Sequence, residues 1–277
     1  MSALPLSISP SSTPSPVPQV AEPTMARVAE ESLSPSLGGR ERGHSAAFEV
    51  KFLLSEEMSH QVESALKEVL RLDPYADPRQ GNAYQITSTY LDTPRLDVFH
   101  RLGRHRLRKF RLRRYGDASW CYLERKTKRK NQVRKHRNKA DLAQLPLLAA
   151  SLILEPWDGA WFHRQVTRWQ LSPTCQVSYL RRAYFGESDG SPIRLTFDRQ
   201  LRAKRLSGWT LFDGAPDHDI LGEQVICELK FRGAMPVCFR NVVAELALAP
   251  KGASKYRRSL EALGVNRQAS EGSLADA

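Results

Sequence analysis

The chain has 277 residues, of which 41% are hydrophobic, which is enough for one large domain or two small ones with a substantial core. Its 42 Lys and Arg against 30 Asp and Glu give a net charge of +12, which favours nucleic acid, phosphorylated metabolites, polyphosphate or an anionic membrane surface as partners. No apolar run approaches the roughly 20 residues of a transmembrane segment, and a secretory signal is not evident, so the expected location is cytoplasmic.

The two ends of the chain differ in composition from its middle. Residues 1–44 are rich in Pro, Ser and Ala, with repeats such as SPSSTPSPVP, and this composition predicts a disordered tail. Met25 lies in this tail, and both Met1 and Met25 stay open as the initiator. Residues 45–265 are predicted to form a single domain, and 266–277 a loose polar tail.

The domain is predicted to begin with a strand, a helix and a second strand. Apolar and charged residues alternate in AAFEVKFLL (46–54), as they do in a strand with one buried face. Ser55 and the acidic residues after it indicate a helix N-terminus, and this helix ends before Asp73-Pro74. The segment YQITSTYL (84–91) then predicts the second strand.

The most charged stretch of the chain is RLRKFRLRRYGDASWCYLERKTKRK (106–130), which predicts a β-hairpin around its Gly-Asp pair. The two-residue period of a strand places Lys109, Arg111 and Arg113 on one face. Cations at this spacing repel one another, so a folded sheet tolerates them best where anions neutralise them. The hairpin therefore predicts a binding site for an anion.

The rest of the chain continues with strands and helices. Strands are predicted at 132–141, 176–185, 191–201, near Trp209 and at 219–231. Helices are predicted between 141 and 169, with a break at Glu155-Pro156, and at 236–248 and 255–263. About eight strands with charged residues on one face predict an α+β fold, a closed antiparallel eight-stranded β-barrel with helices packed outside.

The charged faces of these strands combine many cations with a few carboxylates. They carry Glu49, Lys51, Lys109, Arg111, Arg113, Glu124, Lys126, Lys135, Arg137, Tyr179, Arg181, Arg194, Glu228 and Lys230. Arg and Lys bind phosphate oxygens, and carboxylates among them would bind the divalent metal that accompanies a triphosphate. Nucleic-acid surfaces seldom place Glu among such cations, so sequence-specific nucleic-acid binding is not expected.

Eight short segments follow one another in a family-specific order: FEVKF (48–52), STYLDT (88–93), KFRLRRY (109–115), YLERKTK (122–128), SYLRRAY (178–184), IRLTFD (193–198), CELKF (227–231) and SKYRRSL (254–260). Through them the sequence resembles the polyphosphate polymerase domain of the vacuolar transporter chaperone (VTC) proteins, within the triphosphate tunnel metalloenzyme, or CYTH-like, superfamily. The resemblance extends from Phe48 to about Leu263.

The resemblance implies a barrel-shaped tunnel in which the γ-phosphate of ATP is transferred to a growing polyphosphate, with Mn²⁺ or Mg²⁺ as cofactor. By match of motif, the catalytic residues are Arg111, Arg113, Lys126, Arg181 and Lys255; the substrate-binding residues are Lys51, Lys135, Tyr179, Arg194 and Ser254; the metal ligands are Glu228 and Glu49. The implied partners are ATP and polyphosphate. If synthesis is coupled to transport, a separate membrane protein would hold the chain at the inner face of the membrane.

One departure from the superfamily pattern bears on function. Many tunnel enzymes carry Glu-x-Glu-x-Lys on the first strand, and Ala47 stands here in place of the first acid, which weakens the case for a two-metal hydrolase. Three functions stay open: the ATP-dependent polymerase, a triphosphatase acting on inorganic or nucleoside triphosphate, and a non-catalytic polyphosphate-binding or regulatory domain.

Overall fold

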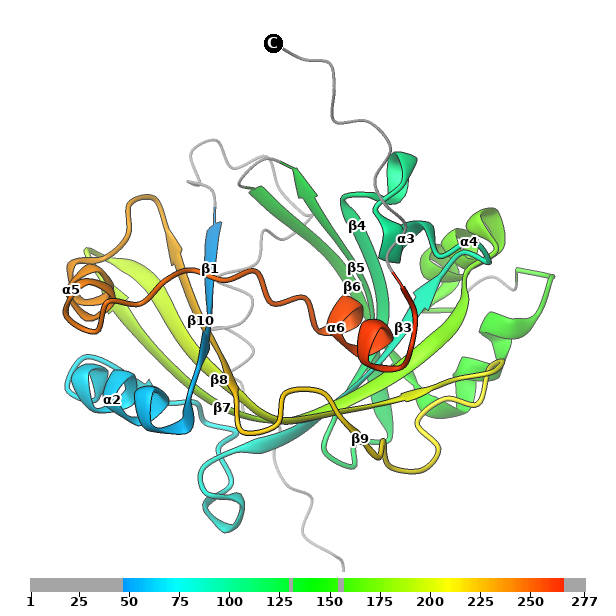
Figure 1. Ribbon diagram of the computed structural model, residues 1–277. Coiled ribbons are helices and arrows are strands. Elements are labelled where there is room, and N and C mark those ends of the chain that lie inside the picture. Colours follow the sequence, from blue (N-terminus) through cyan, green and yellow to red (C-terminus); the bar gives the residue numbers. More distant parts are fainter. Residues whose placement is uncertain (1–46, 130–131, 154–156, 267–277) are drawn as a thin grey trace, which may run out of the picture.

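The computed structural model describes residues 47–129, 132–153 and 157–266, which form a strongly curved antiparallel sheet with helices outside it (Figure 1). Eight strands follow one another along the sheet: β1 (Ala47–Leu54), β10 (Val225–Arg232), β8 (Ser191–Arg205), β7 (Ser172–Ser188), β3 (Tyr84–Asp92), β4 (Arg108–Tyr115), β5 (Trp120–Arg129) and β6 (Gln132–Asp141). Two short strands lie off this path: β2 (Arg71–Leu72) pairs with β7, and β9 (His218–Asp219) pairs with β8.

The prediction of a closed eight-stranded barrel is wrong in two respects. The sheet has ten strands, and within the described residues its end strands β1 and β6 approach each other without pairing. A side-chain ion pair crosses the gap instead and joins β1 to β5, the neighbour of β6, because Lys126 Nζ lies 2.7 Å from Glu49 Oε2. Side chains that meet across this gap hold the backbones farther apart than the 4.7–4.9 Å of a strand ladder.

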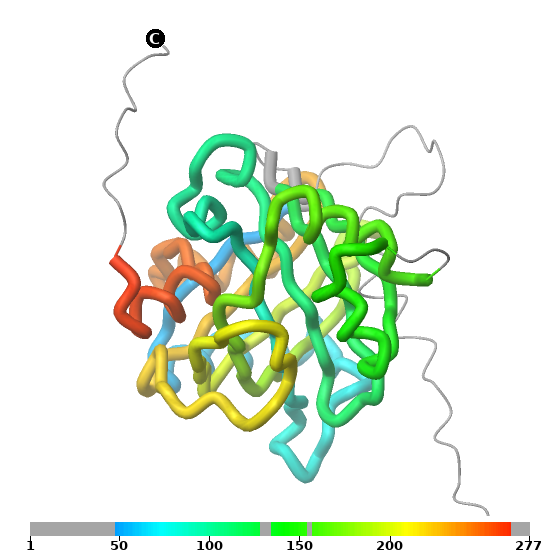
Figure 2. The backbone as a smooth tube through the Cα atoms, turned by 90° about the vertical axis from the view of Figure 1, so that its right-hand side faces the viewer, coloured from blue at the N-terminus to red at the C-terminus, as the bar shows by residue number. Residues whose placement is uncertain are grey.

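Most helices cover the outer face of the curved sheet. Helices α2 (Glu56–Leu66) and α5 (Val237–Glu245) pack on the side of β1, β10 and β8, where Phe52, Phe197 and Phe239 share a buried cluster. The 3₁₀ segment η3 (Leu142–Ala149) and helix α4 (Ala160–Trp169) cover β4 and β5 on the other side. Figure 2 shows these two segments, in green, in front of the strands.

One helix lies at the open side of the sheet. Helix α6 (Lys255–Ala262) follows a segment that crosses from α5, and Tyr256 fixes it against β3. The ring of Tyr256 stacks on that of Tyr90 with centroids 5.1 Å apart, and its hydroxyl donates to Asp92 Oδ2 at 2.6 Å. Short helical segments complete the fold: η1 (Pro78–Gln80), α3 (Asp97–His100) and η2 (Gly103–His105).

Local sequence chemistry explains why most predicted elements form. Ser55 caps α2 by accepting from the Met58 amide at 3.1 Å, and Gly116 turns the β4–β5 hairpin with φ of +50°. The first helix predicted between 141 and 169 is a 3₁₀ segment, since Pro146 inside it cannot donate to an α-helical ladder. No strand forms near Trp209 in the part of the chain that the structure describes, and the last strand begins at Val225 instead of Asp219.

Some predictions lie outside the described residues. These are the break at Glu155-Pro156, the tail at 1–44 with Met25, and nearly all of the tail at 266–277. Within the described ranges, no helix combines the length and the apolar composition needed to cross a bilayer.

Candidate active site

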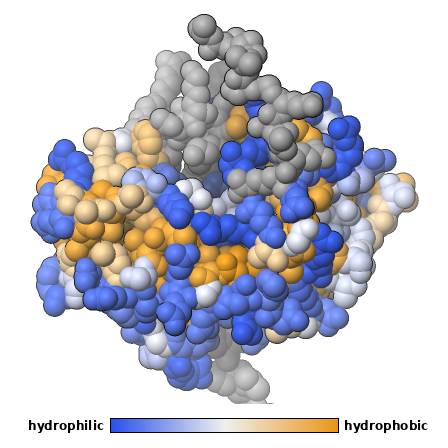
Figure 3. All heavy atoms as spheres, viewed as in Figure 1, coloured by the Kyte–Doolittle hydropathy of each residue, from blue (hydrophilic) through white to orange (hydrophobic). Residues whose placement is uncertain are grey.

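The strand register gathers the predicted charged residues on the inner side of the curved sheet, opposite the outer helices. Cross-strand neighbours on this side include Lys51 with Glu228, Ser88 with Arg113, and Lys126 with Lys135. We name this side the concave face and define it by Glu49, Lys51, Ser88, Lys109, Arg111, Arg113, Glu124, Lys126, Lys135, Tyr179, Arg181, Arg194, Asp198, Glu228 and Lys230, with Ser254 and Lys255 from the start of α6. Figure 3 shows hydrophilic surface near the middle of the open side, with a band of hydrophobic surface directly below it.

Glu124 orients two cations on β4 and β6. Its side chain is 1% exposed, Arg111 Nε lies 2.5 Å from Oε2, and Lys135 Nζ lies 3.0 Å from Oε1. A carboxylate held between two cations has its charge satisfied and fixes the direction of both. Arg111 and Lys135 are therefore positioned before any ligand binds.

Glu49 and Glu228 share one ammonium group. Lys51 Nζ lies 2.7 Å from Glu49 Oε1 and also contacts Glu228 Oε2. Glu49 pairs in addition with Lys126 at 2.7 Å, and Glu228 with Lys230 at 2.8 Å. Burial would raise the pKa of Glu49, but the charges of Lys51 and Lys126 outweigh it and hold that pKa well below its ordinary value.

Asp198 forms the most deeply buried cluster of the site. Its side chain is fully buried, Arg181 binds it in a bidentate manner at 2.6 and 2.8 Å, and Lys255 Nζ from α6 contacts the same carboxylate. Burial would raise the pKa of Asp198, yet Arg181 and Lys255 outweigh it and hold that pKa far below its ordinary range. This cluster fixes the start of α6 against the sheet.

Two cations of the concave face have no carboxylate partner among the described residues. Arg113 donates to Tyr179 Oη at 3.0 Å and to Ser88 Oγ at 3.3 Å, and both partners are hydroxyl groups. Lys109 Nζ donates to Ser254 Oγ at 2.9 Å. These hydrogen bonds position the two cations, whose charge is compensated only from a distance, by Glu49 for Lys109 and by Glu124 for Arg113.

Three lysines have strongly perturbed protonation. Burial lowers the pKa of Lys51 and of Lys126 to about 7 in spite of the neighbouring Glu49 carboxylate. Burial and the charge of Lys126 lower the pKa of Lys109 to about 7 as well. Near neutral pH these lysines are therefore only partly protonated. A polyanion that binds among them would favour their charged form.

Arg194 lies on β8 and pairs with a carboxylate that comes from outside the eight main strands. Its guanidinium donates to Asp73 Oδ2 at 2.8 Å and to the hydroxyl of Tyr84 at 3.2 Å, and it is opposite Lys230 in the register. Burial raises the pKa of Tyr84, so its hydroxyl stays protonated. Arg194 therefore has a carboxylate partner that comes from the segment after β2.

Glu49 and Glu228 suit a divalent metal only if a bound substrate supplies further oxygen ligands. No group of three or more His, Cys, Asp or Glu able to hold a metal occurs in 47–129, 132–153 and 157–266. Glu49 and Glu228 nevertheless lie close enough to share the single ammonium nitrogen of Lys51. Mg²⁺ is commonly held by one or two carboxylates plus substrate phosphates, and this pair suits such a site.

All twelve predicted site residues lie on or beside the concave face. Sequence reasoning missed Asp198, Asp73 and Tyr84 as partners of these residues. The sequence could have placed Asp198 on the charged face, because this residue follows Arg194 by four positions on the same strand and therefore points to the same side. Asp73 had no such signal, since it lies in the irregular segment after β2.

Comparison with protein families identifies the family of the chain. A family model of the VTC domain matches residues 46–264, which is most of the 277-residue chain. The chain belongs to the VTC domain family. A search of functionally curated proteins gives no match.

The solved structures that resemble the chain are distant in sequence. A putative adenylate cyclase from Bacillus halodurans has 12% identity and a TM-score of 0.46, with 76% of this chain and 95% of that chain covered. A putative adenylyl cyclase from Hippeastrum, described as having a dominant triphosphatase activity, has 13% identity and a TM-score of 0.44, with 78% and 95% covered. A putative adenylate cyclase from Vibrio parahaemolyticus has 11% identity and a TM-score of 0.41, with 80% and 100% covered.

Proposed function

We propose that the chain is a polyphosphate polymerase, which transfers the γ-phosphate of ATP to a growing inorganic polyphosphate on the concave face. The observation that carries the proposal is the surplus of cations on that face, where Arg113 and Lys109 have hydrogen bonds but no carboxylate among the described residues. Neither cation has a carboxylate within ion-pair distance, and Glu49 and Glu124 compensate them only from farther away, so this arrangement suits a multiply charged anion as ligand. Membership of the VTC domain family supports the same class of substrate.

The proposed mechanism relies on positioning and neutralisation of charge. Arg111, Arg113 and Arg181 bind the oxygens of the transferred phosphoryl group, for which the planar guanidinium offers paired donors. Glu124 orients Arg111, and Asp198 orients Arg181, before substrate binds. The two guanidinium groups therefore need little reorientation during the reaction. A terminal phosphate of the acceptor attacks in line, and no side chain of the protein needs to act as nucleophile.

Lysines around the three arginines neutralise the charge of the other phosphates of the bound polyphosphate. Lys51, Lys126 and Lys135 line the side formed by β1, β5 and β6, and Lys255 reaches in from α6. Tyr179 supports Arg113, and the Ser254 hydroxyl accepts from Lys109 while its own proton is free for a phosphate oxygen.

The metal is proposed to be Mn²⁺ or Mg²⁺, held by Glu228 and Glu49 together with phosphate oxygens. When bound, a divalent ion there withdraws charge from the phosphates and orients them. Lys51, which the two carboxylates hold in the described structure, would then turn to a phosphate oxygen. A separate membrane protein is proposed as a partner only if synthesis is coupled to transport.

Product analysis separates the three functions. The purified chain is incubated with ATP and Mn²⁺, polymer is resolved on a gel stained for polyphosphate, and ADP and orthophosphate are assayed in parallel. Polymer formed with ADP supports the polymerase, orthophosphate without polymer indicates a triphosphatase, and neither product indicates a binding or regulatory domain.

A matched pair of variants assigns the activity to the concave face. Arg111→Ala/Arg113→Ala should lower turnover by about 100-fold or more, the scale of losing donors to the reacting group. Arg71→Ala/Arg240→Ala removes the same charge from exposed positions on β2 and α5 and should leave turnover unchanged. Equal turnover in both variants would place the reaction elsewhere.

A further inference from the structure

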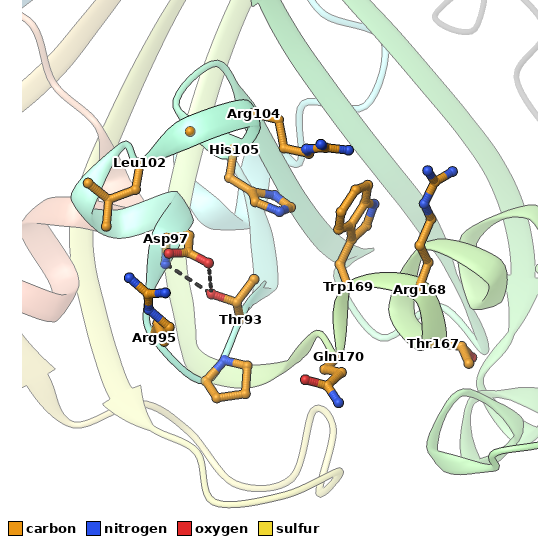
Figure 4. A pocket seen from close by; sticks show the side chains of 12 residues that line it. Thr93, Arg95, Asp97, Leu102, Arg104, His105, Thr167, Arg168, Trp169 and Gln170 are labelled. Atoms are coloured by element: carbon orange, nitrogen blue, oxygen red, sulfur yellow. Dashed lines mark hydrogen bonds between the residues drawn. The ribbon is translucent and has the colours of Figure 1, made fainter.

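A second basic site lies outside the concave face, beyond the ends of β3 and α4. A cavity of about 660 Å³ opens there between residues 93–105 and residues 167–170 (Figure 4). Its lining includes Arg104 and Arg168 on either side of the indole of Trp169, with Arg95 across the cavity beside Thr93 and Asp97. None of these residues belongs to the set proposed for catalysis.

Three arginines at this cavity lie over one aromatic ring. The guanidinium carbon of Arg168 lies 4.8 Å from the Trp169 ring centroid, that of Arg104 5.1 Å, and that of Arg108 5.9 Å. Cation–π contacts hold the guanidinium groups in place but do not neutralise their charge. In the part of the chain that the structure describes, none of the three pairs with a carboxylate.

The single acidic residue among the lining residues is already engaged. Asp97 Oδ2 accepts from the hydroxyl of Thr93 at 2.8 Å, and the Asp97 amide donates back to the same hydroxyl at 3.0 Å, as the dashed lines in Figure 4 show. The cavity thus keeps an excess of positive charge, which suits a ligand with several anionic oxygens.

A buried imidazole supports the indole at the wall of the cavity. His105 is 6% exposed, lines the cavity and meets Trp169 edge to face, with centroids 5.0 Å apart. Its Nδ1 has no hydrogen-bond partner among the described residues. Because Nδ1 is itself buried, a ligand in the cavity does not reach it, and the role of His105 is to support the indole over which the guanidinium groups lie.

The cavity is connected to the concave face through one short segment. Arg108 reaches Trp169, while its neighbour Lys109 lies on the opposite side of β4 and belongs to the concave face. The charge of Arg101, from the same segment, is near enough to help lower the pKa of Lys109. Residues 101–109 thus carry positive charge from the concave face to the cavity.

We propose that this cavity binds a stretch of the polyphosphate chain outside the concave face, so that a long chain is held at two places at once. The inference rests on the function proposed above. Because guanidinium groups already lie over the indole, the ring is not a free platform for a nucleobase, and a phosphoanhydride chain without a base fits better than a nucleotide. Two linked binding places raise the affinity for long chains but not for short ones.

The test compares a long ligand with a short one. Binding of long-chain polyphosphate and of tripolyphosphate is measured by calorimetry for the wild type and for Arg104→Ala/Arg168→Ala. The variant should bind the long chain at least about tenfold more weakly, because it loses the second place, and should bind tripolyphosphate as the wild type does. Arg71→Ala/Arg240→Ala, which removes equal charge elsewhere, should bind both ligands as the wild type does.

Other outcomes overturn the proposal. Unchanged affinity of Arg104→Ala/Arg168→Ala for the long chain would contradict it, and equal loss for both ligands would indicate a site for small phosphates instead. Thermal unfolding of each variant confirms that its fold is intact. The Arg111→Ala/Arg113→Ala variant tests the concave face separately: normal binding of tripolyphosphate by this variant would contradict the function proposed above. The cavity is tested only by Arg104→Ala/Arg168→Ala, so the two proposals can fail independently.

Discussion

Asp198 shows how a single carboxylate organises the proposed site. It lies between Arg181 on β7 and Lys255 on α6, and together with Asp92, which accepts from Tyr256, it joins the sheet to the helix at the open side. A carboxylate buried between two cations is costly to lose, since both cations would then stay buried without compensation.

The variant Asp198→Asn tests this role. We expect the free energy of unfolding of the empty protein to fall by about 3–5 kcal/mol, the typical cost of breaking a buried ion pair. Tripolyphosphate should restore much of the loss, because the anion neutralises Arg181 and Lys255 in place of the carboxylate. Chemical denaturation with and without tripolyphosphate measures both effects, and a loss that the anion does not reduce would separate Asp198 from the anion site.

The lysines predict the pH dependence of binding. The pKa of Lys109 is lowered to about 7, so this lysine is charged below pH 7 and increasingly neutral above it. A bound polyanion favours the charged form, and affinity should therefore fall as pH rises above 7, by up to about tenfold per unit for each lysine that must take up a proton.

Lys109→Arg provides the control for that prediction, because the guanidinium stays charged throughout the range. Calorimetry of tripolyphosphate binding between pH 6 and 9 should show a shallower decline for the variant than for the wild type. The comparison cancels the ionisation of the ligand itself. Parallel curves for the two proteins would mean that Lys109 does not titrate with binding.

At the scale of elements, α6 connects helix capping with the proposed site. Ser254 caps α6 by accepting from the Arg257 amide at 3.4 Å, and the same hydroxyl oxygen accepts from Lys109 at 2.9 Å. Ser55 caps α2 in the same way but lies away from the concave face. The two serines therefore form a matched pair.

Each cap should contribute similarly to stability, but only one should affect binding. Ser254→Ala and Ser55→Ala should each lower the free energy of unfolding by about 1 kcal/mol. Ser254→Ala should also weaken tripolyphosphate binding several-fold, while Ser55→Ala should not. Denaturation and calorimetry on the same preparations check this, and identical binding by the two variants would make Ser254 a purely structural cap.

The elements that the sequence predicted best are those with a strong two-residue period. The hairpin at 106–130 was predicted from its alternating cations and Gly-Asp turn, and it forms as β4 and β5. The same alternation identified the faces that carry Lys51, Arg181 and Glu228. Their roles, in contrast, came from the family resemblance and remain proposals, because periodicity identifies a face but not its ligand.

Contacts from irregular segments could not be predicted in this way. Asp73 reaches Arg194 from the segment after β2, and His105 and Trp169 meet only because α3, η2 and α4 end near one another. Such pairings depend on tertiary packing between residues far apart in the chain. The burial of His105, which is 6% exposed, is one result of this packing.

At the scale of the whole molecule, the sheet is open, and side chains connect its ends. The count of charged strand faces suggested a closed barrel, but a strongly curved open sheet presents the same faces to its interior. The sequence pattern does not reveal whether the two end strands pair, since pairing depends on backbone spacing. Glu49, between Lys51 of β1 and Lys126 of β5, bridges the ends instead.

The variant Glu49→Gln tests this bridge. It leaves Lys51, Lys126 and Lys230 near one another without Glu49, and the free energy of unfolding should fall by about 1–3 kcal/mol at low salt. Glu49 borders the open side, so added salt should recover part of the loss by screening the repulsion. Asp198→Asn, at a fully buried position, should recover much less. Equal salt dependence of the two variants would contradict the assigned difference in environment.

The most direct test of the central claim is a crystal structure of the chain with tripolyphosphate and Mn²⁺. We predict phosphate density on the concave face within hydrogen-bond distance of Arg111, Arg113 and Arg181, and an anomalous Mn²⁺ signal between the phosphates and Glu228. Anion density elsewhere, with the ion pairs of Lys51 and Arg181 retained as in the empty protein, would contradict the account.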